Sequence, residues 1–89
     1  MISDSEKAII LRCAEKYNVT SVYLFGSALQ PDLEYHDIDI GVKGLRPGLF
    51  FKFYGELIMQ LPKPVDLVDL SEESPVADII EEEGVRIYG

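Results

Sequence analysis

The sequence has few basic residues and no long apolar run, and each scarcity excludes a class of protein. Eight Lys and Arg stand against sixteen Asp and Glu among 89 residues, which gives a formal net charge of −8 at pH 7. Because affinity for nucleic acid depends mainly on Lys and Arg contacts to phosphates, we expect no stable nucleic-acid binding by this chain alone. No apolar run approaches the ~18–20 residues that span a bilayer, so we also expect no membrane segment.

Cysteine is nearly absent as well. The one thiol, Cys13, excludes an internal disulfide and a cysteine-rich zinc site, and both exclusions favour a reducing cytoplasm. The acidic stretch MISDSEKAII at the N-terminus lacks the basic start of a secretory signal. We therefore expect a cytoplasmic protein, with a length that favours one domain over residues 1–89.

Helix and strand signals alternate along the rest of the chain. Helices are expected from a cap at residue 3 or 5 to about 17, from 47 to about 61, and from 74 to 84. Strands are expected at 21–25, 37–42, 65–70 and 85–88, and a short helix could begin within 27–33. This order predicts a small α/β (α+β) domain, with three or four strands in a mixed sheet and helices covering one face.

The stretch LFGSALQPDLEYHDIDIGV places a Gly-Ser turn nine residues before an Asp-x-Asp pair. Asp37 and Asp39 project from the same side of the expected strand, where two like charges need a cation, a shared proton or full solvation. Carboxylates are ligands that Mg²⁺ prefers, and a pair bridging two ions suits phosphoryl or nucleotidyl transfer. Gly26 and Ser27 can turn backbone amides and a hydroxyl toward a phosphate. The stretch therefore predicts a site for metal ions and phosphate.

A third carboxylate is available in VDLVDL. Asp66 and Asp69 are three positions apart on the expected strand, so they point to opposite faces and only one can join the pair. We select Asp66 because it lies deeper in the strand, between two apolar residues. The competing interpretation is that Asp66 is an edge-strand charge that discourages aggregation.

Together these residues resemble the minimal nucleotidyltransferases of the DNA polymerase beta-like superfamily, in particular the MntA-type antitoxins of HEPN/MNT toxin–antitoxin pairs. The resemblance implies transfer of AMP from ATP with two Mg²⁺ ions and release of pyrophosphate. It assigns phosphate binding to Gly26 and Ser27 and metal binding to Asp37, Asp39 and Asp66, with Asp66 also a possible base. It further implies a HEPN-type helical partner, because some relatives adenylylate a tyrosine of the partner toxin and so silence it.

One departure from that family supports a rival hypothesis. Where the family often continues Gly-Ser with a small residue, Arg and Gly, this chain reads ALQP at 28–31. The rival is a catalytically weak interaction module that neutralises a helical partner by binding. A small-molecule nucleotidyltransferase is disfavoured, because so short a chain offers no second domain for an acceptor pocket.

The segment GLFFKFYGEL carries two apolar stripes at helical spacing. The stripe expected in the core comprises Leu49, Phe50, Phe53 and Leu57. The second stripe comprises Phe51, Tyr54 and Ile58. We interpret Phe51 and Tyr54 as candidate partner-binding residues, and the alternative is a helix packed on two sides.

Overall fold

The computed structural model describes residues 2–26 and 37–89. The helical elements are α1 (Asp4–Lys16), the 3-10 turn η2 (Pro47–Leu49), α2 (Phe50–Gln60) and α3 (Pro75–Glu83). The strands are β1 (Ser21–Phe25), β2 (Ile38–Lys43), β3 (Val65–Asp69) and β4 (Val85–Tyr88). Every element expected within these residues is confirmed. The short helix expected within 27–33 lies outside the described residues.

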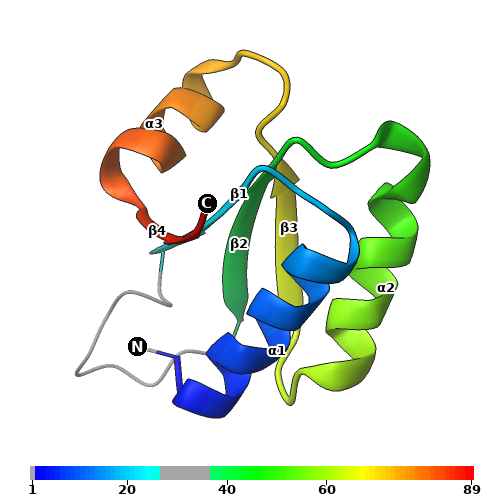
Figure 1. Ribbon diagram of the computed structural model, residues 1–89. Helices are drawn as coiled ribbons and strands as arrows, with labels where there is room; N and C mark the ends of the chain where they lie inside the picture. Colours follow the sequence, from blue (N-terminus) through cyan, green and yellow to red (C-terminus); the bar gives the residue numbers. More distant parts are fainter. Residues whose placement is uncertain (1, 27–36) are drawn as a thin grey trace.

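The four strands of the described residues form one mixed sheet in the order β3-β2-β1-β4 (Figure 1). β1 is antiparallel to both of its neighbours, β2 and β4. β2 and β3 run parallel, and the connection between them carries α2, as a parallel pair requires a crossover. The predicted mixed sheet is therefore confirmed.

Serine caps fix where two of the helices begin. Ser3 Oγ accepts from the Glu6 amide at 3.2 Å, and the Glu6 carboxylate accepts from the Ser3 amide at 2.8 Å. This reciprocal capping box decides between the two expected caps in favour of Ser3. At α3, Ser74 Oγ accepts from the Ala77 amide at 3.0 Å, directly before a proline in the first turn.

Helices α1 and α2 cover one face of the sheet, which we call the α1–α2 face (Figure 1). The continuous core lies there, and its largest fully buried side chains include Phe53, Ile10 and Ile38. Phe53 and Leu57 are buried while Leu49 and Phe50 pack partly against the core, which confirms the predicted core stripe. The predicted covering of one face therefore holds for these two helices.

Helix α3 lies on the opposite side of the strands, which we call the α3 face (Figure 1). It buries a separate small cluster of Leu70, Ala77 and Ile80. Gly41 of β2 makes this approach possible, because a Cβ there would lie 2.8 Å from Leu70 Cδ1 and 3.1 Å from Ile80 Cγ2. In residues 2–26 and 37–89, no helix is both long enough and apolar enough to cross a membrane.

Candidate active site

The candidate site begins at the turn that follows β1. Phe25, the last residue of β1, pairs with Asp39 of β2. Gly26 then turns with a positive φ of 63°, a conformation that glycine adopts without steric cost. Any Cβ at this position would collide with the Asp39 carboxylate. The turn therefore needs glycine for two independent reasons, its backbone angle and its closeness to Asp39.

Asp39 and Asp66 stand opposite each other on neighbouring parallel strands. Strands in such a pair lie about 4.8 Å apart, and residues in register project from the same face. That face is the α3 face, since Gly41 and Val68, two positions further along each strand, lie against the small cluster under α3. The described residues thus bring these two carboxylates together beside the Gly26 turn.

The other predicted site residues have different positions. Asp37 directly precedes β2 and is exposed. Asp69 is paired with Val42, and strand alternation turns it to the face opposite Asp66. Its Oδ1 accepts from the Ser71 amide at 2.9 Å. Ser27 lies outside the described residues, so its predicted phosphate contact stays a prediction.

The donor set can be compared with what Mg²⁺ requires. Among the described residues, no three His, Cys, Asp or Glu side chains form a group that could hold a metal ion. Mg²⁺ usually takes only one or two protein carboxylates and completes its shell with water and substrate phosphates. Asp39 and Asp66, in register on neighbouring strands, supply that number of hard oxygen donors. The residues present fit this ion in donor type and number.

The two candidate partner-binding residues on α2 differ in exposure. The Phe51 side chain is 83% exposed. Tyr54 packs partly against the core, and its hydroxyl donates to the Val65 carbonyl at 2.6 Å. Tyr54 therefore has a contact within the chain, whereas Phe51 lies on the surface. Sequence reasoning passed over Met59, which is 87% exposed on the same helix.

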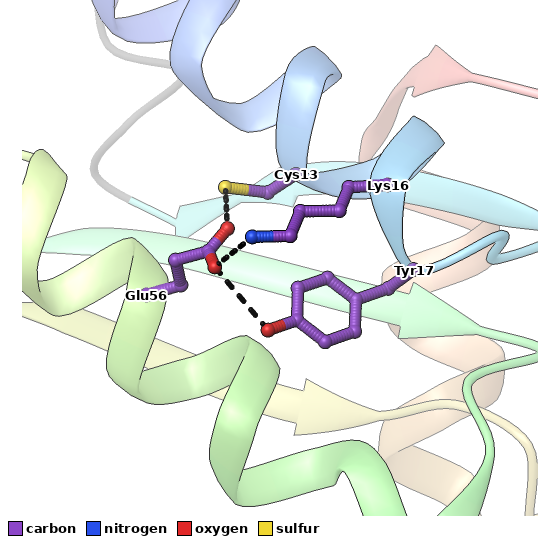
Figure 2. Close-up of polar contacts among 4 residues, drawn as sticks. All are labelled: Cys13, Lys16, Tyr17 and Glu56. Carbon is purple, nitrogen blue, oxygen red and sulfur yellow. Dashed lines mark hydrogen bonds and ion pairs between the residues drawn. The ribbon is translucent and has the colours of Figure 1, made fainter.

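A polar network joins α1 to α2 on the α1–α2 face, and Figure 2 shows its four side chains converging. Glu56 Oε1 accepts from Lys16 Nζ at 2.6 Å and from the Tyr17 hydroxyl at 3.3 Å. Glu56 Oε2 accepts from the Cys13 thiol at 3.5 Å. Sequence reasoning missed this network, because its partners are 39 to 43 residues apart and no local pattern joins them.

The network shifts the protonation of its members in consistent directions. The hydrogen bond from Lys16 is the main cause that holds the pKa of the Glu56 carboxyl below its ordinary value of 4.5. The same bond raises the pKa of the Lys16 ammonium. Burial, followed by the contact with Glu56, raises the pKa of the Cys13 thiol to about 11. Cys13 therefore stays a protonated thiol at neutral pH and is no nucleophile.

The fold is that of a nucleotidyltransferase-type domain, and the family model agrees. Residues 7–89 match the family described as Polymerase beta, Nucleotidyltransferase. The chain belongs to this family, as its resemblance to the superfamily predicted. No curated protein matches the sequence significantly.

Several solved structures of toxin–antitoxin complexes contain a similar chain. One such complex, with AMP-PNP, shares 28% identity at a TM-score of 0.76, covering 93% of this chain and 73% of the other. An MNT antitoxin in complex with the tri-AMPylated HEPN toxin of Shewanella oneidensis shares 28% identity at a TM-score of 0.72, covering 94% and 70%.

A third similar structure is a mutant of an MntA-type toxin–antitoxin pair. It shares 26% identity at a TM-score of 0.74, covering 93% of this chain and 72% of the other. Two of its aspartates, two positions apart, are replaced by glutamate. The resemblance to MNT antitoxins paired with HEPN toxins is thus confirmed.

Proposed function

We propose that this chain is a Mg²⁺-dependent nucleotidyltransferase that transfers AMP from ATP to a hydroxyl group. The acceptor is a tyrosine of a HEPN-type partner toxin, which makes the chain an antitoxin. Residues 1–89 act as one nucleotidyltransferase domain in a reducing cytoplasm, where the buried thiol of Cys13 stays reduced.

The carboxylates and the glycine turn have separate roles in this proposal. Asp37, Asp39 and Asp66 would hold two Mg²⁺ ions, which supply charge stabilisation at the reacting phosphate. Gly26 and Ser27 bind the triphosphate through backbone amides and the hydroxyl.

The reaction is a displacement at the α-phosphorus. The tyrosine oxygen forms a bond to this phosphorus, and the bond from the α-phosphorus to the oxygen bridging to the β-phosphate breaks. Pyrophosphate leaves with that oxygen. The hydroxyl proton passes to the Asp66 carboxylate, which lies on the same face as Asp39.

The observation that carries the proposal is the convergence of Gly26, Asp39 and Asp66. Gly26 follows β1, Asp39 lies in β2 and Asp66 lies in β3. The fold therefore brings together three residues that are distant in the sequence. An ordinary surface would not need a glycine packed against the Asp39 carboxylate. It would also not place the Asp66 carboxylate in register with Asp39, because like charges repel. Membership of the nucleotidyltransferase family supports the same conclusion.

The similar structures support the acceptor and the nucleotide. One contains a HEPN toxin carrying AMP groups, and another contains AMP-PNP, an analogue of ATP. The pair of substituted aspartates in a third has the same spacing as Asp37 and Asp39. By analogy, we assign these two aspartates to the reaction and a HEPN-type protein to the acceptor.

The test is a transfer assay with ATP labelled at the α-phosphate, Mg²⁺ and a HEPN-type partner protein. We expect label on the partner, reduced at least about 10²-fold in Asp39→Asn and in Asp66→Asn, because metal-ion stabilisation is worth several kcal/mol. Asp69→Asn is the matched control on the same strand. It keeps an oxygen to accept from the Ser71 amide, and we expect it to transfer label normally.

Two outcomes would overturn the catalytic proposal. The first is transfer that persists in Asp39→Asn. The second is an Asp69→Asn variant that loses as much activity as Asp66→Asn, which would mean that folding or charge, and not the α3 face, is responsible.

A second candidate function is neutralisation by binding alone. The observation that favours it is the exposed apolar surface of α2, where Phe51, Ile58 and Met59 are 83%, 51% and 87% exposed. In this case the partner is inhibited without receiving label. We expect Phe51→Ala to weaken the complex while the urea midpoint is unchanged, and Val76→Ala, an exposed apolar change on α3, to leave binding intact.

A further inference from the structure

A hollow of about 480 Å³ lies between the C-terminal end of α1 and the beginning of α2. Its polar lining is Lys16, Tyr17, Asn18, Arg46, Lys52 and Glu56. The volume falls within the range of about 300–1,000 Å³ typical of small-molecule sites. Neither the sequence reasoning nor the proposed transfer reaction uses this hollow.

The charge of the hollow is the reverse of the charge of the chain. Acidic residues outnumber basic ones by sixteen to eight in the whole sequence. The lining, in contrast, has three basic side chains and one carboxylate. Such a local reversal produces a positive potential where the rest of the surface repels anions.

The single carboxylate in the lining is already neutralised. Glu56 accepts hydrogen bonds from Lys16, Tyr17 and Cys13, so its charge is balanced by Lys16. Arg46 and Lys52 then account for an uncompensated charge of about +2. Within the described ranges, no Asp or Glu forms an ion pair with Arg46 or Lys52.

The side-chain chemistry indicates which anion would fit. The Arg46 guanidinium is a planar fork that can donate two hydrogen bonds to one phosphate, and the Lys52 ammonium is a point charge. Asn18 adds a neutral amide donor at the wall of the hollow. A doubly charged phosphate group matches two unpaired cations better than a singly charged carboxylate does.

The hollow is separate from the candidate active site. Asp39 pairs with the last residue of β1, whereas Lys43, three residues before Arg46, pairs with the first residue of β1. Tyr17 and Asn18 precede β1, and Gly26 follows it. The two sites therefore lie at opposite ends of the sheet (Figure 1).

We propose that this hollow binds the phosphate group of a small molecule through Arg46 and Lys52. The ligand is either an inorganic phosphate or a phosphate monoester such as a nucleotide, and both present the same group to these cations. The proposal does not depend on the transfer reaction proposed above.

The experiment is an NMR titration of the full chain, free of divalent cations, with inorganic phosphate at constant ionic strength. We expect saturable shifts of the backbone amides at residues 16–18, 46 and 48–52. An Arg46→Gln/Lys52→Gln variant should bind at least about tenfold more weakly, because hydrogen bonds to charged groups contribute about 1.5–3 kcal/mol each. A second titration with AMP, followed at the same residues, distinguishes the two ligands. Tighter binding of AMP than of phosphate indicates a phosphate monoester, and equal binding indicates inorganic phosphate.

A Lys7→Gln/Arg86→Gln variant is the charge-matched control, because it removes two exposed cations elsewhere. We expect it to change phosphate affinity by less than about twofold, as distant charges are screened at physiological salt. Equal weakening in the two variants would overturn the proposal, and so would shifts centred on residues 26 and 39. Acetate that binds as tightly as phosphate would overturn the assignment to phosphate.

Discussion

Within residues 2–26 and 37–89, the two faces of the sheet differ in how completely helices cover them. On the α1–α2 face, two helices bury a continuous core in which Phe53, Ile10 and Ile38 are fully inaccessible to solvent. On the α3 face, one nine-residue helix covers a small cluster whose buried members are Leu70, Ala77 and Ile80. Asp39 and Asp66 are paired on this face, where Asp39 is half-buried and Asp66 is exposed.

This difference places most of the stabilising apolar contacts on one face of the sheet and the candidate catalytic carboxylates on the other. Burial of apolar surface contributes about 25 cal/mol per Å², so most of the hydrophobic stabilisation comes from the α1–α2 face. An unpaired carboxylate within that core would be costly, because an ionised group loses its hydration when it is buried. The thinly covered α3 face can hold Asp39 and Asp66 near solvent at little cost in stability.

The largest expected loss of stability comes from removing a large core side chain on the α1–α2 face. Phe53→Ala deletes a fully buried ring that packs edge-to-face on Tyr17, with ring centroids 5.4 Å apart. We expect the free energy of unfolding to fall by about 3–5 kcal/mol, because the core relaxes only partly around the cavity. Urea denaturation measures the loss.

Ile80→Ala provides the comparison on the other face. Ile80 is buried in the small cluster under α3, which can collapse more easily, so we expect a loss near the lower limit of about 2 kcal/mol. An Ile80→Ala loss equal to that of Phe53→Ala would show that α3 contributes as much to stability as α1 and α2.

The close approach of α3 to the sheet can be tested at Gly41. In Gly41→Ala, the added Cβ would lie 2.8 Å from Leu70 Cδ1 and 3.1 Å from Ile80 Cγ2. Both neighbours are side chains in a thin layer, so we expect a loss of about 1–3 kcal/mol. Hydrogen exchange should become faster in α3 while α1 and α2 are unaffected. Unchanged stability would mean that α3 does not depend on this contact.

Substitution of Gly55, in the middle of α2, should have the opposite effect on stability. A Cβ at Gly55 has no neighbouring heavy atom within 4 Å, so nothing opposes a side chain there. Gly55→Ala should therefore stabilise the chain by about 0.5–1 kcal/mol, the usual advantage of alanine over glycine inside a helix. Urea denaturation beside Gly41→Ala checks the contrast. A destabilised Gly55→Ala variant would contradict it.

Local signals were sufficient to predict most of the fold. Serine caps, prolines in first turns, a glycine stop and strand alternation each depend on neighbouring residues, and these predicted the helices and strands. The order of the strands was beyond these signals, because the pairing of β4 with β1 joins residues more than 60 positions apart. The same applies to α3, whose position on the second face depends on tertiary packing.

The sequence alone likewise predicts only part of the candidate site. Alternation indicated that Asp66 and Asp69 face opposite ways, but only the register of β2 with β3 brings Asp66, and not Asp69, to the face of Asp39. Register depends on the pairing of two distant segments and leaves no mark within either one. For the same reason, no local pattern predicts that Glu56 contacts Cys13, Lys16 and Tyr17.

The smallest expected effect concerns the acid sensitivity of the α1–α2 face. The hydrogen bond from Lys16 holds the pKa of Glu56 below 4.5 in the folded chain. A lowered folded-state pKa gives stability that is present above the unfolded value and is lost as the pH falls through the folded value. The stability advantage of the wild type over Glu56→Gln should therefore be constant above about pH 5.5 and shrink below pH 4.5. Urea denaturation at several pH values measures it. Glu73→Gln, an exposed change before α3, is the control, and an equal pH-dependent difference in that variant would assign the effect to overall charge and not to the link between α1 and α2.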